Sequence, residues 1–246
     1  MRRFIVILTL LGLLVVLFVA ADFAAGRIFE ARARKALQAE LGLDKPPAVQ
    51  VRDFPFLVSL ARGRLRTVDV AASNLVAGGI TVEDLQLTMH DVRVQRQLVL
   101  GRPGTVTVER VDGRARITEK EINRALASRL QGAVVRVDAR GVQIEASQQI
   151  LGQQVDALVR GRLVASDGHL VFKPEQIDAG GVTLPPATLD ALKARGFQYP
   201  LPPLPGNLRP ERVVTELGAV VVFGRLGPLR LEVDRGATKA HQIAPG

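Results

Sequence analysis

The 246-residue chain has no cysteine, no tryptophan and a single tyrosine, Tyr199. Without cysteine it has no disulfide framework, no thiolate zinc site, no cysteine nucleophile and no lipidated cysteine of the lipoprotein kind. The scarcity of rings also leaves few platforms on which the bases of single-stranded nucleic acid stack. Apolar residues still make up 47% of the chain, which excludes general disorder.

Catalytic signatures are missing as well. The sequence contains no GxSxG elbow, no P-loop, no GxGxxG and no HExxH. The three histidines lack metal-ligand spacing, and no motif places a serine beside His90 and Asp91. The adjacent acids Glu83 and Asp84 point to opposite faces of a strand, so they make a poor acid–base or metal pair. We therefore expect a protein that is not an enzyme and that uses no cofactor and no metal.

The formal net charge is +9. Setting aside Arg2 and Arg3 leaves 31 of the 33 basic residues against 24 acidic ones, a net charge of +7 for the remainder. A basic surface points to the phosphates of anionic lipid head groups or of nucleic acid, unless the charge serves only solubility. Because the arginines are scattered and rings are few, we expect an anionic phospholipid and a membrane as partners, and no nucleic acid. The sequence identifies no protein partner.

The N-terminus carries the longest apolar run. Met1-Arg2-Arg3 is followed by eighteen residues without a charge, Phe4 to Ala21, which reach roughly 27 Å as a helix. We predict a single-pass anchor over residues 1–21. Basic residues lie on both sides of this run, but the three-residue tail resembles that of a secretory signal and favours a body on the extracytoplasmic side. Because residues 19–21 also fit a cleavage site, a cleaved signal and a secreted or periplasmic protein is the alternative.

The rest of the chain has two periodicities. A stripe recurring every four residues predicts a helix from Asp22 to Leu43, and a capping box predicts a second one from Thr118. From Ala48 onward a period of two predicts antiparallel strands, with a break at Gly161, and a short helix is expected over 186–195. Since no linker divides the chain, we expect one α+β domain over 22–235 and a flexible tail over 236–246.

The segment Phe54-Pro55-Phe56-Leu57 combines large apolar side chains with a proline. Proline keeps such a segment out of the centre of a sheet. Two interpretations stay open: the segment plugs one end of the core, or it forms an apolar mouth or a membrane contact.

The strands carry branched aliphatic side chains and few rings. A long curved sheet of this kind can enclose a cavity for acyl chains, whereas a core at normal density is the alternative. We expect the groove between the first helix and the strands, with Arg27 and Arg34 as candidates for binding the head group. The candidate lipid-binding residues are Phe29, Ala33, Leu37, Phe54, Phe56, Leu57, Val68, Val70, Leu85, Leu87 and Met89.

Several segments together resemble the LmeA family of phospholipid-binding envelope proteins. They are the helix end Gly42-Leu43, the strand Val49-Gln50-Val51, the run Asp53 to Leu57 with Gly63 after it, the spaced Val68-Asp69-Val70, the helix start at 117–123 and the proline-rich stretch at 201–205. The resemblance covers about residues 22–235.

This resemblance implies a fold and a role. The fold is similar to tubular lipid-binding domains, in which a curved antiparallel sheet wraps a long helix around an acyl-chain groove, here preceded by one transmembrane helix. The family also implies a non-enzymatic, extracytoplasmic role in making or maintaining cell-envelope lipid or lipoglycan of the lipomannan type, and it brings no catalytic residue. A structural envelope scaffold with a closed core and no bound lipid is the alternative.

Overall fold

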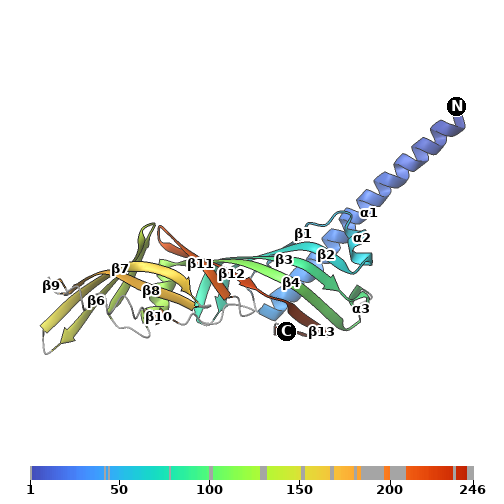
Figure 1. Ribbon diagram of the computed structural model, residues 1–246. Coiled ribbons are helices and arrows are strands. Elements are labelled where there is room, and N and C mark those ends of the chain that lie inside the picture. Colours follow the sequence, from blue (N-terminus) through green and yellow to red (C-terminus); the bar gives the residue numbers. More distant parts are fainter. Residues whose placement is uncertain are drawn as a thin grey trace. The chain divides into compact units, whose positions relative to one another are not determined.

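A computed structural model shows an α+β chain with one long N-terminal helix and antiparallel sheets (Figure 1). It describes residues 2–41, 43, 45–77, 79–99, 102–127, 132–150, 153–166, 169–179, 182–183, 197–199, 209–234 and 237–242. The helix predicted over 186–195 and the proline stretch at 201–205 lie outside these residues.

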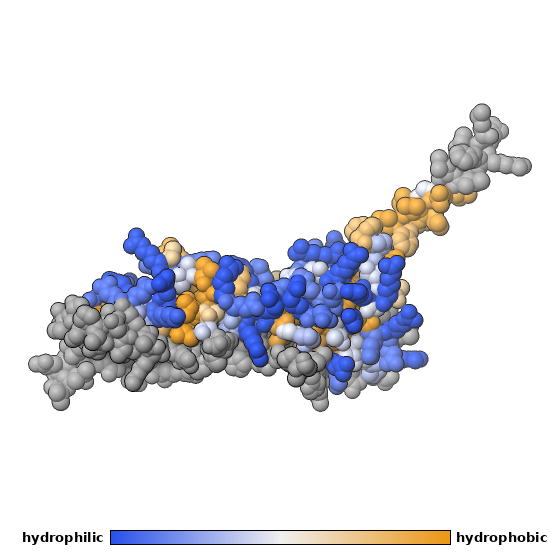
Figure 2. Space-filling view, viewed as in Figure 1, coloured by the Kyte–Doolittle hydropathy of each residue, from blue (hydrophilic) through white to orange (hydrophobic). Residues whose placement is uncertain are grey.

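Helix α1 (Arg2–Leu41) is one continuous helix, where the sequence predicted an anchor followed by a separate helix. Nothing between Phe4 and Leu41 breaks it, because a lone Asp22 costs little in a helix interior. Large apolar side chains from Leu10 to Phe18 are exposed, and Figure 2 shows hydrophobic residues along α1 where it leaves the strands. From Leu10 to Ala39 the helix is long and apolar enough to cross a membrane by length and composition, a test that a signal sequence also passes.

The first sheet has the strand order β1-β2-β3-β4-β12-β11, and β13 pairs with both β4 and β14. The strands are β1 (Ala48–Val51), β2 (Arg64–Ala77), β3 (Ile80–Val94), β4 (Gly104–Thr118), β11 (Arg209–Glu216), β12 (Ala219–Leu226), β13 (Leu229–Asp234) and β14 (Ala237–Gln242). Strand β3 continues past Asp91, where a positive φ shifts the alternation from buried Leu85 to buried Val92 without ending the ladder. Residues 237–242 belong to the predicted tail and form β14.

Within the described ranges, three short helices follow α1: α2 (Phe56–Ala61), α3 (Arg96–Val99) and α4 (Glu119–Ala127). The hydroxyl of Thr118 accepts the backbone N–H of Glu121 at 3.4 Å, which confirms half of the predicted capping box. The Glu121 carboxylate accepts a hydrogen bond from Arg124 instead of reaching back.

The second sheet has the order β10-β8-β7-β6-β5, with β9 paired to β8. The strands are β5 (Ala133–Asp138), β6 (Gly141–Ile150), β7 (Gln153–Ser166), β8 (His169–Ala179), β9 (Val182–Thr183) and β10 (Phe197–Tyr199). The predicted break at Gly161 is confirmed by a register shift between Arg160 and Gly161. A Cβ at Gly161 would lie 2.3 Å from the Lys173 carbonyl oxygen, so only glycine allows this approach.

The chain forms two compact units. Unit 1 consists of residues 1–71, 87–111 and 227–246, and unit 2 of residues 72–86 and 112–226. In unit 2, β11 and β12 contact strands of the second sheet, and four consecutive β12 residues, Ala219 to Val222, are buried on both sides. In unit 1, α1 contacts β1 and α2. The buried apolar side chains of unit 1 are those of Val49, Phe56, Leu65, Val68, Val70, Val92, Val94, Val108, Val111 and Leu229.

Candidate functional site

Asp22 joins α1 to α2. Its side chain is only 2% exposed, and its two carboxylate oxygens accept the backbone N–H groups of Phe56 at 2.8 Å and Leu57 at 2.7 Å. These donors begin α2, and the residue before them, Pro55, provides no side-chain cap. Asp22 therefore caps α2 from 34 residues away. Sequence reasoning missed this contact because helix caps are sought in the residues next to the helix.

Phe54 and Phe56 have opposite environments. The Phe56 side chain is 3% exposed, and its ring centroid lies 5.4 Å from that of Phe29. Gly26 borders the same ring, since a Cβ at this position would lie 3.9 Å from the Phe56 ring, an ordinary van der Waals distance. Phe54 is 63% exposed, with its centroid 6.0 Å from that of Phe23. Phe56 therefore plugs the core, whereas Phe54 lies on the surface.

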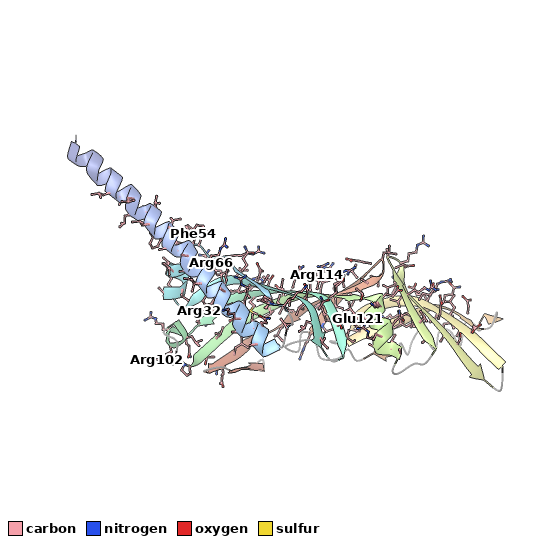
Figure 3. The ribbon with its side chains drawn as sticks, turned by 180° about the vertical axis from the view of Figure 1, so that it is seen from behind. Arg32, Phe54, Arg66, Arg102, Arg114 and Glu121 are labelled. Carbon is pink, nitrogen blue, oxygen red and sulfur yellow. The ribbon has the colours of Figure 1, made fainter. Side chains whose placement is uncertain are left out.

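Helix α1 also lies along β1, the first strand in the sheet order. A carboxylate oxygen of Glu30 accepts the backbone N–H of Val51 at 3.0 Å and so satisfies a donor at the free edge of this strand. Figures 1 and 3, seen from opposite sides, show α1 behind the strands of unit 1 in one view and in front of them in the other. Arg32 and Lys35 are exposed on α1. The predicted stripe is half-buried, and its members are Phe29, Ala33 and Leu37.

The strands of unit 1 have one polar and one apolar face. The Thr88 hydroxyl donates to the Asp69 carboxylate at 2.9 Å, so these two residues of β3 and β2 share the polar face. Because side chains alternate along a strand, their sequence neighbours occupy the opposite face. Those neighbours are Val68, Val70, Leu87 and Met89. The structure thus groups four of the predicted lipid-binding residues on one face.

Burial across this apolar face is uneven. Val68 and Val70 are buried, but Leu87 and Met89 are half-buried. Val106 of β4 and Leu231 of β13 pair with each other and are also half-buried. A core at normal interior density buries side chains of this kind. We call the half-buried apolar set the helix-side surface, and it consists of Phe29, Ala33, Leu37, Leu87, Met89, Val106 and Leu231.

Other predicted site residues have distinct positions. Leu85 is buried and belongs to unit 2, and Leu57 is half-buried. Arg27 is exposed and Arg34 half-buried, and neither forms an ion pair with any acid among the described residues. These two arginines are seven positions apart, so they lie on the same side of α1, about 10 Å apart along its axis. Sequence reasoning omitted Val106 and Leu231, although the alternation along β4 and β13 marks both.

Polar groups elsewhere serve the fold. Arg64 donates to Asp91 at 2.6 Å, and this contact lowers the pKa of the Asp91 carboxyl below its ordinary value. The hydrogen bond from Arg225 to Asp112 raises the pKa of that guanidinium. Across the described ranges, no group of three or more histidine, aspartate or glutamate side chains is placed to hold a metal ion. The helix-side surface is therefore the candidate site, and its chemistry is that of apolar contact.

Comparisons with known proteins agree with this chemistry. The profile of the family described as LmeA-like phospholipid-binding matches residues 20–225, which run from the middle of α1 into β12. No curated protein and no solved structure gave a significant match. Because the profile covers most of the 246 residues, the chain belongs to the LmeA-like phospholipid-binding family.

Proposed function

We propose that this protein is a membrane-anchored, non-enzymatic phospholipid carrier or sensor whose body lies on the extracytoplasmic side of the membrane. Family membership supports lipid binding in general. The exposed apolar side chains of α1 from Leu10 to Phe18 support anchoring in a membrane. The family resemblance adds a role in making or maintaining cell-envelope lipid or lipoglycan of the lipomannan type.

The observation that carries the proposal is the half-burial of the helix-side surface. Apolar surface left in contact with water forgoes about 25 cal/mol per Å² of favourable transfer free energy. The α1 stripe and the strands belong to the same unit, yet the apolar side chains of both remain partly exposed to water. An acyl chain lying between them would bury both. We propose that the acyl chain lies between α1 and the strands of unit 1, in the groove of a tubular lipid-binding fold.

The head group would bind beside α1. Arg27 and Arg34 share one side of the helix and form no ion pair with an acid among the described residues. The Arg34 Nε donates to the Glu30 carbonyl oxygen at 3.4 Å, which leaves the two Nη groups of this guanidinium for phosphate. Charge-assisted hydrogen bonds from arginine to phosphate favour an anionic phospholipid. The hydrogen bonds of Asp22 hold the start of α2 beside α1, about one and a half helical turns before Arg27.

The test is the lipid content of the purified full chain. The protein is washed in detergent, extracted with organic solvent and analysed by mass spectrometry, with the bulk lipid of the source membrane as reference. We expect about one phospholipid per chain, enriched in anionic species over the bulk, and a loss of that enrichment in Arg27→Gln/Arg34→Gln. A folded protein that carries no lipid, or only lipid of bulk composition, would instead favour an envelope scaffold with a closed core.

A further inference from the structure

Two exposed rings lie side by side at the base of the apolar half of α1. Phe23 is 62% exposed and Phe54 is 63% exposed, and their ring centroids are 6.0 Å apart. They come from different elements, α1 and the turn before α2. We call this pair the aromatic tip. Rings exposed to this extent are costly in water, and they gain free energy wherever a partner covers them.

The aromatic tip lies at the level where the apolar run ends. Phe23 follows Ala21, the last residue of that run, by two positions, or about 3 Å along the helix. The residue between them, Asp22, would place a carboxylate at the edge of a hydrocarbon core, which is costly for an unpaired charge. Its burial and its two backbone N–H donors remove that cost. The same two hydrogen bonds fix α2, and with it Phe54, at this level.

Cationic side chains lie next to the aromatic tip. Arg27 is exposed one helical turn beyond Phe23, on the same side of α1. Arg66 is exposed as well, and its backbone N–H donates to the Asp53 carboxylate at 2.7 Å, directly before Phe54. Figure 3 shows Phe54 and Arg66 near each other, where α1 leaves the strands. Neither arginine forms an ion pair with a described acid.

We propose that the aromatic tip inserts into the interface of the bilayer that α1 spans, and that Arg66 contacts its lipid phosphates. The proposal rests on the proposed membrane anchoring of α1 and deepens it. The order along the chain is apolar helix, exposed rings, then cations, which matches hydrocarbon, interface and anionic head groups. The occupant is the bilayer and not a protein, because the tip continues the apolar surface of the span. The body is then held at two points, α1 and the turn before α2.

The absence of tryptophan from the chain makes a clean test. Full-length Phe54→Trp is reconstituted in vesicles of phosphatidylcholine and phosphatidylglycerol that contain lipids brominated at a shallow or a deep acyl position. Leu14→Trp, within the apolar run, is the control for the span. Leu217→Trp, in the turn between β11 and β12 where the native side chain is 85% exposed, is the control for water.

We expect blue-shifted emission from Phe54→Trp and several-fold stronger quenching by shallow bromine than for Leu217→Trp. Leu14→Trp should respond most to deep bromine. If Leu14→Trp is quenched and Phe54→Trp is not, the span stands and the inserted tip is wrong. If Phe54→Trp is blue-shifted but unquenched, protein covers the ring, which also overturns the proposal. If Leu14→Trp is unquenched, both the anchor and the tip are wrong.

The phosphate contacts have a separate readout. Adding Arg66→Gln to Phe54→Trp should weaken its shallow quenching in vesicles with phosphatidylglycerol, and Arg66→Lys in its place should restore the quenching. Equal quenching in all three proteins would exclude Arg66 from the interface.

Discussion

Unit 1 and unit 2 use the same aliphatic side chains but bury them to different extents. In unit 2, residues Ala219 to Val222 are buried on both sides, because β12 contacts strands of the second sheet. In the described part of unit 1, α1 lies along the strands (Figures 1 and 3), and the helix-side surface stays half-buried. Neighbouring strands repeat about every 4.8 Å and cover a face continuously, whereas one helix covers a stripe about 10 Å wide. Whether strands or a helix pack on an apolar face, rather than the residue types on that face, therefore decides whether its side chains become fully buried.

The largest expected effect is in unit 2. Val221→Asp places an unpaired carboxylate where the native side chain is fully buried, and we expect a loss above about 4 kcal/mol in the free energy of unfolding. Val214→Asp is the matched control, since Val214 pairs with Val221 across the same ladder but is exposed. Thermal unfolding of the full chain in detergent, followed by circular dichroism, measures the stability of both variants. Equal destabilisation by the two variants would contradict the closed core of unit 2.

The two phenylalanines beside Pro55 give the next effect. Phe56→Ala should cost about 3–5 kcal/mol, because it removes a buried ring that contacts Phe29. Phe54→Ala removes an exposed ring two residues away and should leave the melting temperature in detergent nearly unchanged. The same melts check this pair, and a larger loss for Phe54→Ala than for Phe56→Ala would reverse the assignment of plug and surface.

Overpacking compares the two units directly. Ala115→Phe enlarges a fully buried residue of unit 2 and should destabilise the fold by about 1–3 kcal/mol. Ala33→Phe enlarges a half-buried residue of the helix-side surface and should be tolerated, while the phospholipid bound per chain falls. A strongly destabilised Ala33→Phe protein that keeps its lipid would show that the acyl chain does not lie at α1.

The smallest expected effect concerns an exposed ion pair of unit 1. The Arg64 guanidinium lowers the pKa of Asp91, so this carboxylate contributes stability above the pKa of an unfolded aspartate and loses it as the pH falls through the lower folded value. The contribution is small because the pair is exposed. We expect Asp91→Asn to lower the stability slightly near pH 7, and the difference from the wild type to shrink as the pH falls below about 4. A difference that is absent near pH 7 and grows toward acidic pH would contradict this sign.

Local patterns in the sequence predict most of the architecture. Period-two alternation located the strands, and Gly161 marked the register shift in β7. The continuity of α1 was missed because Asp22 resembles the end of a span, and its partners at the start of α2 lie far away in the sequence. Helix α2 was missed because Pro55 was used only to exclude the centre of a sheet, although proline is also common where a helix begins.

The candidate site was predictable only in part. Alternation grouped Val68, Val70, Leu87 and Met89, because side chains two apart share a face. It did not reveal that Leu85 belongs to unit 2, since β3 contributes to both units without a break in the strand. It also did not separate Phe54 from Phe56, because only the tertiary contacts with Phe23 and Phe29 distinguish them.

The central claim is that unit 1, and not unit 2, holds the acyl chain. The most direct measurement is crosslinking of the detergent-washed full chain with a phospholipid that carries a diazirine in its acyl chain, followed by peptide mapping. The account predicts adducts on residues 29–37, 87–89, 106 and 231, in addition to those expected on the exposed apolar half of α1. Adducts on that half of α1 and on unit 2 strands, with none on the helix-side surface, would contradict it.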